Sequence, residues 1–339
     1  MTMIVKKSPI NQGFWHFDIV NLFTKRSDKE YVFLDIETTG FAPANSQLYL
    51  IGCLYFSENS WMQAQWLAET FDEEFLILES FLDTLPEKFC LVTFNGSTFD
   101  IPYLRHKQEQ FSLDGFENLN FFDLYKVLKP YKQLLNFSHF RQQDLEKFVD
   151  FHRKGDVSAK KCITIYQEFL RTEDPSLPEI LLRHNTQDLQ GMLSILPLLS
   201  YTQLPKGLFQ VRSSEIQDNS LNVLCTLNAP LPHPVEFDSD FLSGRGYQNQ
   251  LTLCLPLTEG KLRKFYADYK DYDYLPGEDM AIHRSLSSYI ARDKKKRATA
   301  ETCYTWFDCS LVFAEHPDQL RDCLTEYLQL LIFGHLIPH

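Results

Sequence analysis

Two carboxylates, Asp35 and Glu37, close an apolar run in residues 31–40, YVFLDIETTG, just before a turn. In a strand, alternate side chains project from the same face, so both acids point one way and Ile36 points the other. Like charges about 4 Å apart repel by roughly 1 kcal/mol in water and roughly 4 kcal/mol near a protein surface, so a partly buried pair needs protons or a cation. Oxygen ligands at this spacing suit Mg²⁺ or Mn²⁺. The alternative is a core strand that ends in a polar turn with solvated acids.

A third carboxylate follows another predicted strand. Residues 90–94 form an apolar run that ends in an Asn-Gly turn, and Asp100 lies at the start of the helix predicted next. Pro102 fits the first turn of that helix. Asp100 has a purely structural explanation as well, because an acid in the first turn favours the helix dipole.

A histidine and a fourth carboxylate interrupt a late helix. Apolar residues recur at helical spacing over residues 179–200, yet the middle of this segment is polar, His-Asn-Thr-Gln-Asp. His184 and Asp188 are four residues apart, so they lie on one helix face, one turn apart. An ordinary surface histidine and a solvated acid would account for each residue alone. A shared site with Asp35 accounts for the interruption itself.

The elements that must position these groups alternate between strands and helices. Residues 47–56 and 61–68 predict two strands that continue the first in an antiparallel meander, because the connections are short. Apolar spacing predicts a helix over residues 73–85, which Pro86 ends. The remaining predictions are a short strand at residues 120–125 and helices at 123–131, 144–151 and 158–170.

The composition is that of a folded protein. The chain has 339 residues, 44% of them apolar, which suggests two domains with a core each. We find no signal peptide and no run of about 18 apolar residues, so we expect a cytoplasmic protein that does not enter a membrane. The eight cysteines are scattered without a Cys-x-x-Cys pair, which indicates reduced thiols and neither a disulfide framework nor a zinc site.

The net charge of −12 is opposite in sign to that of most nucleic-acid-binding proteins. It does not exclude a nucleic acid as partner, because bound cations and a local basic rim set the potential where a phosphate lies. The densest basic run is residues 292–297, RDKKKR. This run is either a solvated helix end or loop, or a contact for phosphate groups.

The helical pattern stops around residues 201–212, which contain Pro205 and Gly207. We therefore expect an N-terminal arm at residues 1–29, a first domain at 30–203 and a second domain at 213–339. Strand-like runs and a closing helix indicate that the second domain is a smaller α+β domain. The runs are residues 221–227, 251–257, 262–266 and 302–307, and the helix is 316–333.

Taken in order, the motifs resemble those of the DEDD (DnaQ-like) 3′–5′ exonucleases of the ribonuclease H-like fold. The motifs are Asp-x-Glu at the end of the first strand, Asn-x4-Asp after a later strand and His-x3-Asp on a late helix. Residues 34–40 (LDIETTG), 94–104 (FNGSTFDIPYL) and 184–188 (HNTQD) are most similar to the YprB-type ribonuclease H-like family. The resemblance covers about residues 30–200. It implies an α/β fold with a mixed five-stranded sheet flanked by helices.

The resemblance also implies a role for each matching position. Two divalent cations, Mg²⁺ or Mn²⁺, would be held by four carboxylates: Asp35, Glu37, Asp100 and Asp188. The general base that deprotonates the attacking water would be His184. The terminal nucleotide would be lined by Thr38, Thr39 and Gly40, with Asn95 and Phe99 near it. Histidine-type exonucleases usually place the histidine five positions before the last aspartate, whereas the spacing of four found here is that of the tyrosine-type subclass and of the YprB-type pattern.

These roles imply a metal-dependent 3′–5′ exonuclease that hydrolyses phosphodiester bonds at the 3′ end of a nucleic acid by a two-metal mechanism. DNA is favoured over RNA by analogy alone, because YprB-type proteins are associated with DNA repair through a partner helicase. One alternative is a catalytically silent or partner-dependent nucleic-acid-binding module on the same scaffold. A second alternative is a haloacid-dehalogenase-like phosphatase, but that class would need an aspartate in place of Glu37. A resolvase-type endonuclease would be recognised by its action on a circular substrate.

Overall fold

The computed structural model describes residues 3–10, 20, 27–115, 119–155, 157–266, 268–309, 324 and 326–328. The chain divides into two compact units. The first comprises Met1–Lys129 and His139–Pro197, and the second comprises Pro130–Ser138 and Leu198–His339. Much of the arm expected at residues 1–29 and of the helix expected at 316–333 lies outside the described residues.

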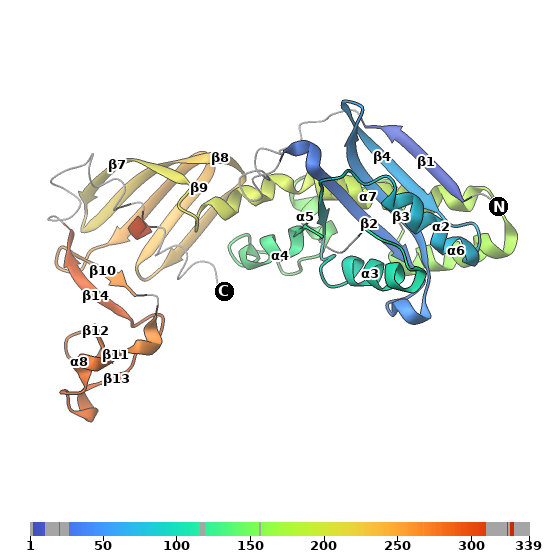
Figure 1. Cartoon of the computed structure of the whole chain (residues 1–339). Coiled ribbons are helices and arrows are strands. Elements are labelled where there is room, and N and C mark those ends of the chain that lie inside the picture. The colour runs from blue at the N-terminus through green and yellow to red at the C-terminus, as the bar shows by residue number, and fades with distance from the viewer. Residues whose placement is uncertain are drawn as a thin grey trace. The chain divides into compact units, whose positions relative to one another are not determined.

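In the first unit, the described residues form one mixed sheet in the order β1-β4-β3-β2-β5-β6 (Figure 1). β2 pairs antiparallel with β3 and parallel with β5, and β6 continues the parallel part. The expected meander and the mixed sheet flanked by helices are confirmed. The strands are β1 (Ile4–Pro9), β2 (Tyr31–Thr38), β3 (Leu48–Ser57), β4 (Ser60–Leu67), β5 (Cys90–Thr93) and β6 (Phe121–Asp123).

This sheet has six strands in the described part of the chain, one more than the expected five. The additional strand is β1, which comes from the expected N-terminal arm and pairs antiparallel with β4 at the edge of the sheet. Only its first residue is partly buried, and the other five are exposed. The segment therefore lacks the alternation of apolar and polar residues by which a half-buried strand is recognised in a sequence. It forms a strand because it pairs with the edge of β4.

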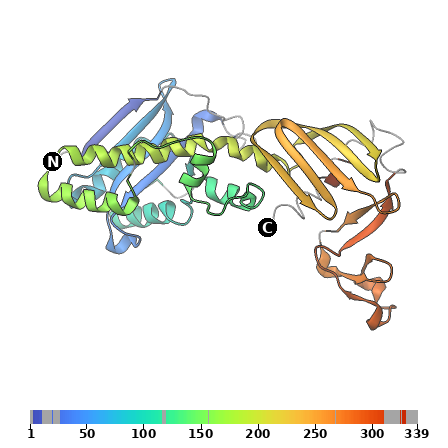
Figure 2. The same ribbon diagram turned by 180° about the vertical axis from the view of Figure 1, so that it is seen from behind.

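β2 lies inside the sheet with both faces covered, which explains its nearly continuous apolar sequence. Its side chains Val32, Leu34 and Ile36 pack in one core with α2 and α3. The opposite face is covered by α6 and α7, which share a second core with β3 and β4. Figure 2 shows these two helices lying across that face. Because side chains alternate along a strand, Asp35 and Glu37 point toward the face that α7 covers.

The helices of the first unit correspond to those predicted from apolar spacing, with boundaries shifted by a few residues. The late helix begins earlier than expected and ends at Ser194, where a 3₁₀ segment follows. The helices are α2 (Glu74–Leu82), α3 (Asp100–Phe111), α4 (Leu124–Leu128), α5 (Gln142–Phe148), α6 (Ala159–Thr172) and α7 (Ser176–Ser194).

The described part of the second unit consists mainly of antiparallel strands, and every predicted strand run in it overlaps an observed strand. Burial alternates along much of the long strand β8, as expected for a strand with one covered face. None of the helices described in the chain is long and apolar enough to cross a membrane. The elements are β7 (Phe209–Gln217), β8 (Ser220–Ser239), β9 (Leu242–Pro256), β10 (Lys261–Phe265), β11 (Tyr272–Leu275), β12 (Met280–His283), α8 (Arg284–Ser287), β13 (Lys296–Arg297) and β14 (Tyr304–Asp308).

Candidate active site

Three carboxylates converge beside the C-terminal half of β2. Asp35 and Glu37 come from β2 itself, and Asp188 approaches them from α7. One carboxyl oxygen from each of these residues lies within 4.8 Å of the other two. The proximity follows from two local periodicities, the alternation of β2 and the helical turn of α7, once the helix packs on that face of the sheet.

His184 joins this group one turn before Asp188 on α7. Its Nε2 atom lies 3.3 Å from Oε1 of Glu37 and 3.3 Å from Oδ2 of Asp188. Only 7% of the imidazole side chain is exposed. The polar run in the middle of an otherwise apolar helix is therefore explained by its contact with the acids of β2.

Asp100 approaches the group from the N-terminal end of α3. Its carboxylate lies near the backbone N–H of Ile36, the residue between Asp35 and Glu37 on β2, and this N–H and that of Asp100 itself lower its pKa. Burial raises the pKa of Asp100 to about 7, and these N–H groups oppose the shift. All four carboxylates inferred from the sequence therefore lie near one another, and two of them, Glu37 and Asp188, also lie next to His184.

Burial dominates the electrostatics of this acidic group. It raises the pKa of Asp35 well above its usual range, and the charges of the other three carboxylates raise it further. The pKa of Glu37 is raised to about 7, chiefly by burial, while His184 pulls it down. Ionised carboxylates this close together are stabilised by a divalent cation. A donor set made of carboxylate oxygens fits a hard ion such as Mg²⁺ or Mn²⁺.

A thiol lies near the same group. The ligand atoms of Glu37, Cys162 and His184 are also within 4.8 Å of one another, and such a softer set would suit zinc. Cys162, however, is completely buried in the core that α6 and α7 share. Asp188 keeps 18% of its side chain exposed, so the carboxylate set is the better fit for an ion that must meet a substrate from solution.

Asn185 is a positioning residue that sequence reasoning did not single out. Its Nδ2 donates to Oδ2 of Asp35 at 2.8 Å and to the backbone carbonyl of Asp35 at 3.2 Å. Gln65 Nε2 in turn donates to Oδ1 of Asn185 at 2.8 Å, and Asn185 is completely buried. This chain of hydrogen bonds orients one oxygen of Asp35. Asn185 stood inside the His-Asn-x-x-Asp motif, but nothing in the sequence indicated Gln65 as its partner.

Gly52 leaves the space that Asn185 occupies. It pairs with Asp35 across β2 and β3, and a Cβ atom at this position would lie 1.8 Å from Oδ1 of Asn185. We expect Gly52→Ala to displace Asn185, to destabilise the protein by about 1–3 kcal/mol and to lower any activity that depends on Asp35. The matched control is Gly277→Ala, because a Cβ there meets no atom within 4 Å. Thermal melting and activity of the two variants, measured side by side, check this, and equal behaviour would contradict it.

Arg153 is a second positioning residue without a signal in the sequence. It lies in the loop between α5 and α6, where its Nη2 is 2.7 Å from Oδ1 of Asp188 and 2.6 Å from Oε1 of Glu146. Gln142 Nε2 donates both to Oε1 of Glu146 at 2.9 Å and to the backbone carbonyl of Asp188 at 2.8 Å. Arg153 thus holds one carboxyl oxygen of Asp188 while the other faces His184.

The turn after β2 is braced by its own side chains. Thr38 Oγ1 donates to the carbonyl of Gly40 at 2.8 Å, and Thr39 Oγ1 accepts from the backbone N–H of Gln47 at 2.9 Å. The hydroxyl of Ser46 also donates to the Gly40 carbonyl, at 3.1 Å. These hydrogen bonds shape the loop next to Asp35, and the expected contact of its residues with a terminal nucleotide stays a prediction.

Asn95 and Phe99 lie on the turn between β5 and α3. Asn95 has a positive φ of 64°, and its backbone N–H donates to Oδ1 of Asp123 at 2.8 Å. The ring of Phe99 meets that of Phe41 edge to face, with 6.0 Å between centroids. Phe41 directly follows Gly40 and is 91% exposed, so an aromatic surface lies beside the turn. The sequence did not indicate Phe41, because one aromatic residue in a turn has no periodic pattern.

Comparison with known sequences identifies relatives of this chain. Residues 32–200 match the RNase_H superfamily. The protein YprB of Bacillus subtilis (strain 168), which is described as uncharacterized, is 26% identical over 183 residues. That match covers 51% of this chain and 44% of YprB, so the chain spans less than half of this relative.

The chain also resembles solved structures at low identity, among them a DNA polymerase and an exonuclease complex. The family B DNA polymerase from Pyrobaculum calidifontis has 15% identity and a TM-score of 0.41, over 60% of this chain and 29% of the polymerase. The zinc-bound E. coli ExoI–ssDNA complex has 13% identity and a TM-score of 0.33, over 91% of this chain and 74% of the enzyme. The residues that match the superfamily include β2 to β6 of the mixed sheet except Tyr31, together with the whole acidic group. Through residues 32–200, the chain therefore belongs to the ribonuclease H superfamily and, within it, to a YprB-type family.

Proposed function

We propose that this protein is a metal-dependent 3′–5′ exonuclease of the DEDD type that hydrolyses phosphodiester bonds of a nucleic acid. The observation that carries the proposal is the convergence of Asp35, Glu37 and Asp188 around His184, with Asp100 beside them. Membership of residues 32–200 in the ribonuclease H superfamily supports the same reaction class.

The proposed roles follow the positions of the side chains. Asp35, Glu37, Asp100 and Asp188 would hold two divalent cations. Such cations, when bound, activate water on one side of the scissile phosphate and stabilise the leaving 3′-oxygen on the other. His184 would accept the proton of the attacking water at Nε2, since a neutral imidazole serves as a general base near pH 7–8. Asn185 and Arg153 would keep Asp35 and Asp188 oriented through the hydrogen bonds described above.

The substrate end would meet the turn after β2. Thr38, Thr39 and Gly40 would lie along the terminal nucleotide, and Asn95 would lie near it. The exposed ring of Phe41, backed by Phe99, offers a face on which a base can stack. DNA as the preferred substrate, a role in DNA repair and a partner helicase are carried by the family resemblance alone, and each stays a prediction.

His184→Gln should slow cleavage by about 10²–10⁴-fold, the usual contribution of a general base. The four carboxylates remain in this variant, so Mn²⁺ should still raise its melting temperature. Single-turnover rates together with melting curves check both statements. His139→Gln removes an exposed histidine of the same unit and serves as the control. A full rate in His184→Gln, or a lost response to Mn²⁺, would contradict the role of general base.

The proposal is tested by digesting single- and double-stranded DNA and RNA labelled at the 3′ or the 5′ end, with Mg²⁺, Mn²⁺ or EDTA. Metal-dependent shortening from the 3′ end would support it and would identify the substrate. Binding of ends without turnover would favour the silent or partner-dependent binding module. Cleavage of a circular strand would indicate an endonuclease, and phosphate release from a small phosphomonoester alone would indicate a phosphatase.

A further inference from the structure

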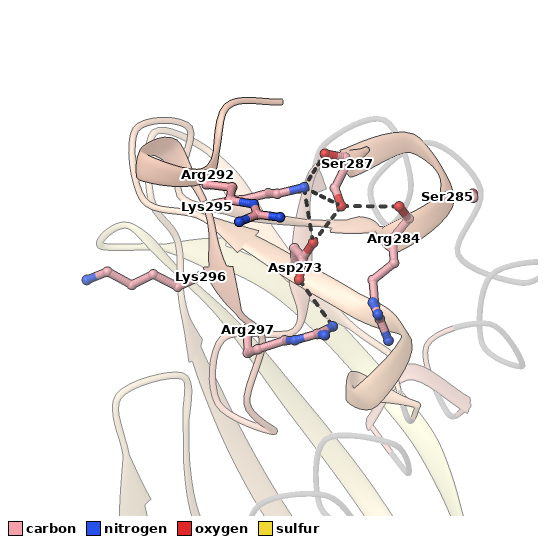
Figure 3. A pocket seen from close by; sticks show the side chains of 8 residues that line it. All are labelled: Asp273, Arg284, Ser285, Ser287, Arg292, Lys295, Lys296 and Arg297. Atoms are coloured by element: carbon pink, nitrogen blue, oxygen red, sulfur yellow. Dashed lines mark hydrogen bonds and ion pairs between the residues drawn. The ribbon is translucent and has the colours of Figure 1, made fainter. Parts of the chain in front are cut away.

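A basic pocket of about 620 Å³ lies in the second unit (Figure 3). It is formed around β11, the short helix α8 and the segment that ends in β13. One acidic residue, Asp273, lines it, and Ser285 and Ser287 contribute hydroxyl groups. Its basic residues are Arg284, Arg292, Lys295, Lys296 and Arg297.

Asp273 is already paired within the pocket wall. It is only 8% exposed, and it accepts a hydrogen bond from the hydroxyl of Ser287 at 2.5 Å. Lys295 Nζ lies 3.6 Å from Oδ2 of Asp273, and Arg297 Nη1 lies 3.6 Å from Oδ1. Lys295 Nζ also donates to the backbone carbonyl of Ser287. In Figure 3, dashed lines join Ser287, Lys295 and Arg297 to Asp273 in one group. The acid therefore fixes the wall, and among the described residues no carboxylate forms an ion pair with the other basic side chains of the pocket.

Two arginines of the pocket remain available to an anion. Arg284 and Arg292 are exposed, and no carboxylate in the described part of the chain forms an ion pair with either of them. Figure 3 shows Lys296 extending away from the paired group, and this residue is exposed. In a protein with a net charge of −12, this concentration of positive charge is a local exception and attracts a polyanion.

In the structure, the basic run at residues 292–297 is part of a larger basic group that is fixed by ion pairs. The run is not simply a solvated loop, because Lys295 and Arg297 form ion pairs with Asp273. It gains Arg284 from α8, eight positions earlier in the chain, which also lines the pocket. The basic residues are thus arranged by the packing of the run against β11 and α8.

We infer that this pocket binds the phosphate backbone of a single-stranded nucleic acid. The identity of the ligand rests on the proposed nuclease function of the first unit. The pocket is large for one phosphate group, and long exposed arginine and lysine side chains suit successive phosphates of an extended strand. Tyr289 follows the pocket residue Ser287 by two positions and is 91% exposed. Exposed aromatic rings beside cations are the usual platform for unpaired bases.

The test measures binding of a fluorescein-labelled single-stranded DNA of about 20 nucleotides by anisotropy in EDTA, over a range of salt concentrations. Arg284→Gln/Arg292→Gln should bind roughly tenfold more weakly, and its salt slope should fall by about 1.4, the value for two lost phosphate contacts on a single strand. Lys261→Gln/Lys264→Gln removes the same charge from exposed positions outside the pocket and should bind like the wild type. Tyr289→Ala should weaken binding of the single strand and leave that of a duplex unchanged.

Arg284→Lys/Arg292→Lys separates charge from structural damage. This variant keeps both charges, so the wild-type salt slope should return. The inference is overturned if the glutamine pair binds like the wild type, if the two glutamine pairs lose equal affinity, or if the lysine pair does not recover the slope. Because EDTA prevents cleavage, this binding result is independent of the digestion assay. A wild-type protein that binds the strand through the pocket but never cleaves it would refute the exonuclease and not the pocket.

Discussion

Replacing Asp35 by asparagine should abolish metal-dependent cleavage, with a loss of roughly 10³-fold or more. One carboxyl oxygen of Asp35 lies within 4.8 Å of those of Glu37 and Asp188, so the charge of Asp35 belongs to the group that would hold the cation. Asparagine has nearly the same shape and can still accept the hydrogen bond that Asn185 donates to Oδ2 of Asp35. The substitution therefore removes the charge and preserves the surrounding contacts. Single-turnover digestion of an end-labelled strand measures the effect.

The thermal stability of the same variant provides a second readout. Burial and neighbouring charges raise the pKa of Asp35, so its ionised form destabilises the metal-free protein as the pH rises. Asp35→Asn should then melt at the same or a higher temperature than the wild type in EDTA near pH 8, and Mn²⁺ should no longer raise that temperature. Asp72→Asn, at an exposed position of the same unit, should behave like the wild type. Undiminished cleavage by Asp35→Asn would refute the assignment of this acidic group.

Arg153→Met should destabilise the first unit by about 3–5 kcal/mol, because it leaves a buried charge without its partner. Arg153 and Glu146 expose only 7% and 2% of their side chains, and the guanidinium also holds Asp188 at 2.7 Å. Activity should fall with stability, since Asp188 loses the group that orients one of its oxygens. Melting curves and cleavage rates at a temperature where the variant is folded separate the two effects.

The control for this prediction is Arg171→Met. Arg171 pairs with Glu168 three positions earlier, but the two side chains are 70% and 48% exposed. Solvent screens an exposed pair of this kind, so it contributes little to stability and its loss should hardly change the melting temperature. The double variant Arg153→Met/Glu146→Gln should recover part of the stability, because it removes the unpaired charge. Equal losses in Arg153→Met and Arg171→Met would show that the buried pair does not stabilise this unit.

Much of the fold and of the candidate site follows from short-range patterns in the sequence. The alternation in β2 places Asp35 and Glu37 on one face, and the spacing of four places His184 and Asp188 on one turn of α7. β1 was not predicted, because nearly all of its residues are exposed and its sequence therefore lacks the apolar alternation of a strand with one buried face. The basic pocket of the second unit could not be predicted either, because the basic residues at 292–297 form no periodic pattern that would indicate their partners.

By itself, the sequence predicted which residues could hold a cation, and it determined which strands and helices carry these residues and in what order they occur. Only the tertiary structure decided their supporting partners: Gln65 behind Asn185, Gly52 beside it, Arg153 against Asp188, and Asp273 among the basic residues of the pocket. Alternation and helical turns act between neighbours, so they can be recognised in a single chain. A hydrogen bond or ion pair between distant segments depends on how sheets and helices pack, and it has no counterpart in local sequence spacing.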